Sequence, residues 1–164
     1  ELDRRIIDRL RAAIGALSGL TVSAYWPFRA EPDLRPFLKE IAAAGGRCAL
    51  PVVVERAAPL DFRAWAPGDR LARGVWNIPV PEETAESVIP DLLIAPVVGF
   101  DPACYRLGYG GGFFDRTLAA HPGTPRVLGV GYEVAALPTI HPQWHDVPLD
   151  SVVTEACTWR PAVE

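Results

Sequence analysis

The sequence has no methionine among its 164 residues, no excess of basic residues and no long apolar run. A membrane-spanning helix needs about 20 consecutive apolar residues, and no segment approaches that length. The net charge is −4, whereas a nucleic-acid-binding face normally requires clustered positive charge. We therefore expect a soluble cytoplasmic protein that binds neither membrane nor nucleic acid. Because Glu1 cannot be an initiator, we also expect a natural reading frame that begins further upstream.

Cysteine is scarce, and its three positions form no recognisable site. Cys48, Cys104 and Cys157 are widely separated and include no CxxC pair. That spacing fits neither a zinc site nor the disulfide framework of a small secreted protein. The pattern favours reduced thiols and a cytoplasmic location.

Proline and glycine, in contrast, are abundant. With 17 prolines and 14 glycines in one domain-sized chain, we expect a single domain over residues 1–164 built from many short elements. Apolar spacing predicts an amphipathic helix over residues 2–17, followed by a strand, a helix and a strand. Further strands and helices complete a single-domain three-layer α/β/α fold with a mostly parallel sheet of five or more strands. The expected strands span 20–25, 48–54, 91–98, 126–131 and 151–156, the further helices span 32–44 and 113–120, and two short candidates, 60–65 and 74–78, are interpreted as a hairpin or irregular cover.

The most informative segment spans residues 106–116 and follows the most apolar predicted strand. Its glycines remove side chains from successive peptide units, so several N–H groups can approach one anion. The segment leads into a helix N-terminus, which also favours negative charge. It matches neither the dinucleotide fingerprint nor the Walker A pattern, and a simple glycine-rich turn is the alternative. The glycines of the expected phosphate cradle are Gly108, Gly110, Gly111 and Gly112, and Tyr109 among them could hydrogen-bond a phosphate, stack on a base or pack on its own domain.

Charged residues in and after this segment could complete the site. Arg106 and Arg116 could clamp phosphate oxygens, with Arg106 preferred, or could be solvated surface residues. Asp115 could hold magnesium or simply favour the helix dipole. His145 and Asp146 could supply a second magnesium ligand, although such a pair is often only loop polarity. No Ser, His and Asp triad is recognisable.

Three residues outside the loop are candidates for a flat ligand. Glu31 lies in the first strand-to-helix loop, where the alternative role is helix capping. Trp26 and Trp76 lie beside proline-bearing loops and could wall a heterocycle, or could pack internally.

Motifs distributed along nearly the whole chain resemble the 5-formyltetrahydrofolate cyclo-ligase (methenyltetrahydrofolate synthetase) family. They comprise Gly99-Phe100-Asp101, residues 106–116, Trp76-Asn77-Ile78-Pro79, His145-Asp146 and the segments 148–150 and 153–155. The resemblance implies closure of 5-formyltetrahydrofolate to 5,10-methenyltetrahydrofolate, driven by ATP with Mg²⁺, through phosphoryl activation of the formyl oxygen. It also implies a basic N-terminal helix preceding this chain.

The resemblance also implies a role for each candidate residue. Arg106 and Asp115 would be catalytic, residues 106–114 would bind ATP, and Asp115 and Asp146 would hold Mg²⁺. Trp26, Glu31, Trp76 and Phe114 would bind the folate. We expect a monomer. The alternatives are a noncatalytic folate- or nucleotide-binding relative and a phosphosugar-binding protein.

Overall fold

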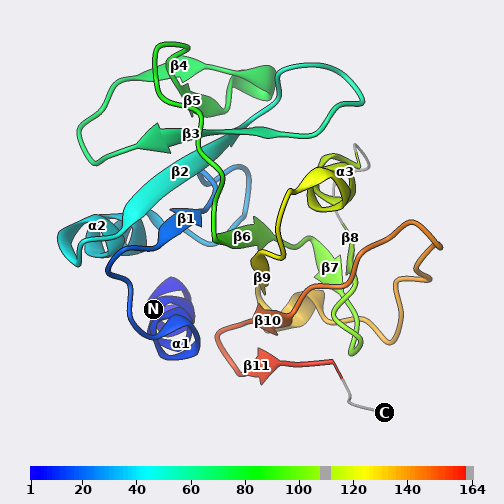
Figure 1. The fold of residues 1–164 in the computed structure, drawn as a ribbon. Coiled ribbons are helices and arrows are strands. Elements are labelled where there is room, and N and C mark those ends of the chain that lie inside the picture. Colours follow the sequence, from blue (N-terminus) through cyan, green and yellow to red (C-terminus); the bar gives the residue numbers. More distant parts are fainter. Residues whose placement is uncertain (108–111, 162–164) are drawn as a thin grey trace.

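The computed structural model describes residues 1–107 and 112–161 and contains a central seven-stranded sheet. The five inner strands pair in parallel, while the two edge strands pair antiparallel to their neighbours (Figure 1). In spatial order the strands are β11 (Thr158–Trp159), β10 (Ser151–Val153), β9 (Arg126–Val130), β6 (Leu92–Pro96), β1 (Thr21–Ser23), β2 (Arg47–Val52) and β3 (Asp61–Trp65). The predicted mostly parallel sheet is confirmed.

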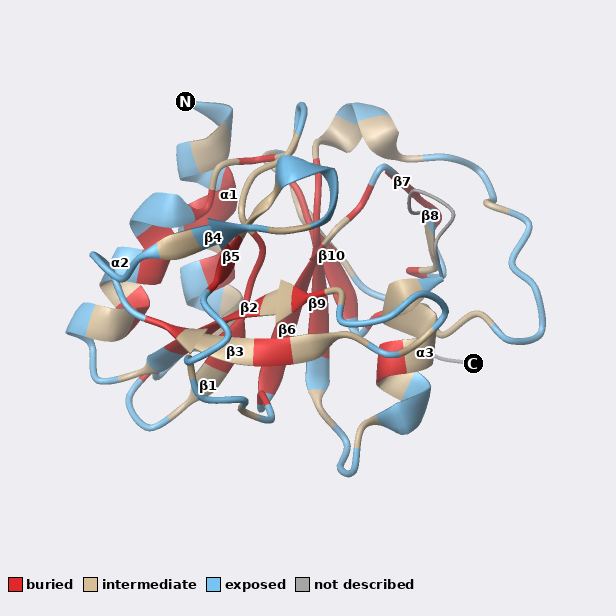
Figure 2. Ribbon diagram, turned by 90° about the horizontal axis from the view of Figure 1, so that it is seen from above, coloured by how far each residue is buried: buried red, intermediate tan, exposed pale blue. Residues whose placement is uncertain are grey.

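Helices cover both faces of this sheet. Helices α1 (Leu2–Ile14) and α2 (Arg35–Ala43) pack into one apolar cluster with residues of β1, β2, β6 and β9. Helix α3 (Phe113–Ala120) packs against the second cluster, on the opposite face. Figure 2 shows that the inner strands are largely buried while the outer helix surfaces are exposed. The three-layer α/β/α prediction is therefore confirmed.

Strand β6 lies in the middle of the sheet, as its continuous apolar sequence predicts. Leu92, Leu93, Ile94 and Ala95 are all at most 2% exposed. Such a run suits a parallel strand that is covered on both faces. The predicted β1–α2–β2 unit is also present, with Val22 of β1 opposite Cys48 of β2.

Helix boundaries differ from the prediction where backbone geometry intervenes. Helix α1 ends at Ile14 rather than at residue 17, because Gly15 has a φ of 78°, which is outside the helical region. Leu17 is nevertheless buried, so its apolar character reflects packing after the helix. Helix α2 starts at Arg35, with Pro36 in its first turn.

The two short candidate segments take different forms. Residues 61–65 form edge strand β3, which pairs with β2. Residues 74–78 form no strand; they connect β4 (Leu71–Arg73) to β5 (Pro79–Pro81) through the 3-10 turn η1 (Val75–Asn77). Residues 74–78 therefore form the turn of an antiparallel β4–β5 hairpin, whereas 61–65 pair with β2 and not with 74–78.

The remaining elements lie beyond the carboxyl end of β6. Strands β7 (Gly99–Phe100) and β8 (Arg106–Leu107) form a short antiparallel ribbon that precedes α3. The 3-10 turn η2 (Glu133–Ala135) follows β9. None of the helices in the described ranges is long and apolar enough to cross a bilayer.

Candidate functional site

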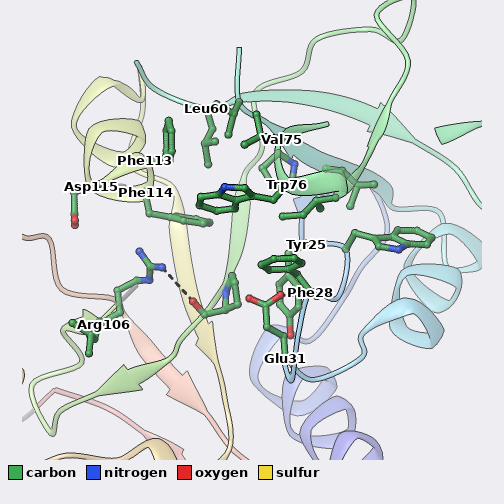
Figure 3. Close-up of a pocket in the computed structure, with 18 of the residues that line it drawn as sticks. Tyr25, Phe28, Glu31, Leu60, Val75, Trp76, Arg106, Phe113, Phe114 and Asp115 are labelled. Carbon is green, nitrogen blue, oxygen red and sulfur yellow. Dashed lines mark hydrogen bonds between the residues drawn. The ribbon is translucent and has the colours of Figure 1, made fainter. Parts of the chain in front are cut away.

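A pocket of about 460 Å³ lies beside the carboxyl ends of the inner strands. Seven parts of the chain line it: the loop after β1, the end of β2, Leu60 before β3, the β4–β5 hairpin, Pro96 at the end of β6, the segment from β8 into α3, and the loop before β10. Ligands of open α/β sheets bind at this edge, because the loops there converge. The pocket brings together most of the residues that the sequence singles out (Figure 3).

Arg106 extends from β8 along one wall of the pocket. Its Nη2 donates a hydrogen bond to the carbonyl of Pro96, at the end of β6, over 3.4 Å. Its guanidinium also lies over the ring of Phe114, 4.8 Å from the centroid. A guanidinium held by a ring face and a carbonyl is restrained in direction, which suits recognition of an oxyanion.

Helix α3 begins at Gly112 in a conformation that favours glycine. Gly112 is the N-cap with a φ of 69°, and an added Cβ would lie 3.0 Å from Nη1 of Arg116. Phe114 packs against the second core cluster, while Arg116 lies over Phe113. The first turn of α3 therefore faces the pocket with a fixed orientation.

Asp115 and Asp146 both line the pocket, and Asp115 lies on the same side as Arg106 (Figure 3). Asp115 Oδ1 accepts a hydrogen bond from Val147 N–H at 3.2 Å, and Asp146 Oδ2 accepts one from Gln143 N–H at 2.7 Å. Nε2 of His145 is 3.6 Å from Asp146 Oδ1. Asp115 is thus bonded to the backbone of the residue that follows Asp146.

These carboxylates fit a magnesium ion whose other ligands come from phosphate oxygens and water. Within residues 1–107 and 112–161, no group of three or more His, Cys, Asp or Glu side chains could hold a metal. Protein sites for Mg²⁺ often supply only one or two carboxylates, with phosphate oxygens and waters completing the octahedron. Asp115 and Asp146 match that donor set, and each has a carboxylate oxygen that accepts no hydrogen bond from the described chain.

Glu31 lies across the pocket from Arg106 (Figure 3). Its Oε1 accepts a hydrogen bond from Phe28 N–H at 2.9 Å, and its own N–H donates to the carbonyl of Phe28. The helix-capping alternative is wrong, because α2 begins after Leu34 without a side-chain cap. Instead, Glu31 stabilises its own loop and presents its carboxylate to the pocket.

Trp76 forms part of the wall between these two sides. Its indole stacks on Phe28 with ring centroids 6.2 Å apart and an interplanar angle of 12°. The backbone of Trp76 has a φ of 58°, in the left-handed region that bulky residues rarely adopt. Strain of this kind persists where surrounding contacts determine the conformation. Trp76 lines the pocket and, as a whole residue, is 58% exposed.

Trp26 combines the two roles considered for it. Its ring contributes to the pocket wall, but it also packs edge-on against Trp65 at 5.7 Å and lies beside the guanidinium of Arg35. Packing therefore fixes its orientation more firmly than that of Trp76.

Several pocket residues have no sequence signal of their own. Phe28 is one, although its position between Trp26 and Glu31 could have indicated it. His141 and Gln143 come from an irregular loop, and the apolar wall formed by Leu60 and Val75 depends on the hairpin geometry. Gly108, Tyr109, Gly110 and Gly111 of the predicted phosphate cradle lie outside the described residues; Leu107, Gly112, Phe113 and Phe114 all line the pocket.

Comparison with known proteins gives a consistent result. The sequence profile of the 5-formyltetrahydrofolate cyclo-ligase family matches residues 3–155. The 5-formyltetrahydrofolate cyclo-ligase of Escherichia coli is 31% identical over 167 residues, covering 98% of this chain and 91% of the relative. That of Mycolicibacterium smegmatis is 34% identical over 145 residues, covering 84% and 75%.

Solved structures are similar over the same extent. The NMR structure of Aquifex aeolicus 5,10-methenyltetrahydrofolate synthetase superposes with a TM-score of 0.81 at 27% identity, covering 99% of this chain and 84% of that one. The synthetase from Mycoplasma pneumoniae gives a TM-score of 0.75 at 21% identity, which shows a shared fold.

Proposed function

The chain belongs to the 5-formyltetrahydrofolate cyclo-ligase family, and we propose that it closes 5-formyltetrahydrofolate to 5,10-methenyltetrahydrofolate with ATP and Mg²⁺. The observation that carries the proposal is a single pocket with an anion-binding side and a ring-binding side. Arg106 and the start of α3 form the first, while Glu31 and the stacked rings of Phe28 and Trp76 form the second. A reaction between a nucleotide and a folate needs both sides to meet.

The triphosphate would lie against Arg106 and the N-terminus of α3. The first N–H groups of a helix have no intrahelical partner and favour an anion. Helix α3 spans eight residues and begins at the pocket. Residues 106–114 would together form this side, with Arg106 neutralising charge on the transferred phosphoryl group.

Asp115 and Asp146 would hold the magnesium ion beside the phosphates. When bound, the ion neutralises charge on phosphate oxygens. The chain's own contribution is the hydrogen bond from Val147 N–H to Asp115, which holds Asp115 against the backbone next to Asp146. Repulsion between the two carboxylates would be relieved by the cation.

The folate would lie against Glu31 and the aromatic wall. The aminopyrimidinone end of a pterin presents neighbouring N–H donors, and a carboxylate can accept both. The bond from Phe28 N–H restrains the Glu31 carboxylate, so little freedom is lost on binding. Trp26, Trp76 and Phe114 would enclose the remaining faces of the ring system.

The reaction requires no nucleophile from the protein. Transfer of the γ-phosphoryl group to the formyl oxygen turns that oxygen into a good leaving group. Attack by N10 on the formyl carbon then closes the ring, N10 loses its proton, and phosphate departs. Catalysis is mainly positioning and charge neutralisation. Burial raises the pKa of the Cys48 and Cys104 thiols to about 11, so neither is a thiolate at neutral pH.

A direct assay tests this function. The protein is mixed with 5-formyltetrahydrofolate and MgATP, and the near-ultraviolet absorbance of the methenyl product is followed together with ADP release. Stoichiometric formation of both products is expected. Folate binding by calorimetry without either product would overturn the proposal in favour of a noncatalytic binding protein.

We further propose that the protein is a cytoplasmic monomer. The three cysteines are unpaired and two are buried, which suits a reducing compartment. Sedimentation at micromolar concentration tests the oligomeric state.

A further inference from the structure

Asp101 is a buried carboxylate that lies next to the pocket without lining it. Its residue is 4% exposed. Oδ1 accepts hydrogen bonds from Ala103 N–H at 3.1 Å and Tyr105 N–H at 3.2 Å, and Oδ2 accepts one from Ile140 N–H at 3.2 Å. The two oxygens therefore hold two different segments, one next to Asp101 in the sequence and one 39 positions after it.

The first segment is the turn that joins β7 to β8. Asp101 N–H donates to the carbonyl of Tyr105 at 3.2 Å, and Cys104 N–H donates to the carbonyl of Asp101 at 2.8 Å. Cys104 has a φ of 63°, so this turn contains a residue in the left-handed region. The Oδ1 bonds offset that strain and fix Tyr105, the residue immediately before Arg106.

The second segment is the loop 137–148, in which Ile140 lies. This loop contributes Ile140, His141, Gln143, His145 and Asp146 to the pocket. The bond from Ile140 to Asp101 is therefore made within the loop, six residues before Asp146.

Both ends of the loop are attached to the same ribbon. Leu137 N–H donates to the carbonyl of Phe100 at 2.8 Å, and Leu149 N–H donates to that of Cys104 at 2.8 Å. The ends would hold without the Asp101 side chain, but the interior of the loop would lose its link to the ribbon.

We propose that Asp101 is a positioning residue, which holds Arg106 and the Asp146 loop in register on the phosphate side of the pocket. Only a carboxylate of this size offers two acceptor oxygens that point to separate donors. The kinetic part of this proposal rests on the proposed function; its structural part does not.

The variant Asp101→Asn tests the coupling. An amide keeps one acceptor and turns an NH₂ donor toward the other N–H group, so one of the two attachments is lost. Loss of such supporting contacts typically costs about 10- to 100-fold in metal affinity or activity. We expect the KM for ATP and the Mg²⁺ concentration for half-maximal rate each to rise at least about tenfold, with the KM for the folate nearly unchanged.

A purely structural role predicts a different pattern. Partial unfolding reduces the amount of active enzyme and lowers kcat, while both KM values and the Mg²⁺ requirement stay the same. That pattern in Asp101→Asn would overturn the proposal.

The variant Asp101→Ser separates the two attachments. A serine hydroxyl can make the local turn bonds, although more weakly, but is too short to reach Ile140. We expect the same rise in the ATP and Mg²⁺ requirements; kinetics like those of the wild type would show that the bond to Ile140 has no role. Asp91→Asn is the matched control, because Asp91 Oδ2 also accepts a hydrogen bond from a backbone N–H, that of Thr21. This bond lies at the amino ends of β1 and β6, whereas the pocket lies at the carboxyl ends of the strands.

Hydrogen exchange gives a readout that does not depend on activity, and its wild-type measurement requires no variant. In the wild-type protein the Ile140 amide should exchange slowly, and in both Asp101 variants that fold it should exchange at least about tenfold faster, while Asp91→Asn leaves it unchanged. A rapidly exchanging Ile140 amide in the wild type would overturn the proposal. If the wild type lacked cyclo-ligase activity but showed this protection, the proposed function would fail and the structural link would stand.

Discussion

Oδ1 of Asp115 accepts a hydrogen bond from the backbone N–H of Val147 at 3.2 Å, which ties the first turn of α3 to the loop before β10. Asp146 is the residue before Val147, so the contact joins the first candidate magnesium ligand to the backbone next to the second. The hydrogen bond joins the Asp115 side chain to a backbone segment 32 residues later in the sequence, so the position of each depends on the other.

Asp115→Asn should remove the charge at this site while keeping the oxygen that accepts from Val147. We expect kcat to fall about 100-fold or more, because the magnesium ion that neutralises charge on the phosphoryl group would lose a charged ligand. The unfolding temperature should change by less than about 4 °C, which corresponds to about 1 kcal/mol for a chain of this size. Asp69→Asn is the control, since Asp69 also accepts a backbone N–H but lies away from the pocket. Equal loss of activity and unfolding temperature in Asp115→Asn would contradict a metal role.

Arg106→Lys should preserve charge but lose the flat guanidinium that lies over Phe114. We expect kcat/KM for ATP to fall about 100-fold, because an ammonium can neither stack in this way nor contact two phosphate oxygens in a plane. Arg116→Lys provides the comparison, since Arg116 lies over Phe113 in a similar manner. Steady-state kinetics that gave equal losses in both variants would show that Arg106 has no special role.

Glu31→Gln should keep the acceptor for Phe28 N–H and weaken contact with the folate. A hydrogen bond to a charged group contributes about 1.5–3 kcal/mol, so the folate dissociation constant should rise about 10- to 100-fold while that of ATP is unchanged. Titration calorimetry measures both constants. Glu40→Gln, which affects only the outer contact with Arg11, should alter neither. An unaltered folate constant in Glu31→Gln would remove Glu31 from the folate site.

Gly112→Ala should destabilise the start of α3. A residue with Cβ at a φ of 69° costs about 1–2 kcal/mol, and this Cβ would also lie 3.0 Å from Arg116. We expect the unfolding temperature to fall by about 2–8 °C and the KM for ATP to rise. Gly123→Ala is the control, because its Cβ would make only ordinary contact with His121 and its φ is not positive. Calorimetric unfolding that showed no difference between the variants would contradict the strain.

Alkaline pH should destabilise the protein through its buried thiols. Burial raises the pKa of Cys48 and Cys104 from an ordinary 9.0 to about 11, so above pH 9 the unfolded chain loses thiol protons that the folded chain retains. Their contribution to the free energy of unfolding is therefore complete below about pH 9 and is lost as the pH rises toward 11. Urea unfolding at several pH values should show this fall, and Cys48→Ala should reduce its slope. Parallel curves for the variant and the wild type would exclude Cys48 as a cause.

The strongest local signals in the sequence predicted the sheet and α3. The continuous apolar run of β6 excludes a solvent-exposed strand. The predicted helix 113–120 matches α3, because Gly112 precedes the helix and His121-Pro122 follows it. The convergence of Arg106, Asp115 and Glu31 on one pocket followed from parallel topology, which brings the loops after separate strands to one edge.

Tertiary contacts account for what the sequence could not indicate. Trp76 favours an extended strand by its type, yet it adopts a left-handed conformation in a turn because its indole stacks on Phe28, far away in the sequence. No periodic sequence pattern indicates the hydrogen bond between Asp101 and Ile140, since it links a side chain to a backbone amide in an irregular loop. The stacking of Phe28 on Trp76 could likewise not be predicted, since only the tertiary fold brings the two rings together.

The pocket is assembled from both ends of the chain, and this has a consequence for folding. Its walls include residues 25–31, before α2, and residues 140–146, just before β10. Parallel pairing across such separations forms slowly, because long loops must close before the contacts are made. A chain emerging from the ribosome can therefore bury much of β1, β2 and β6 before it can bind either substrate, and the completed pocket first exists when nearly the whole sequence has been synthesised.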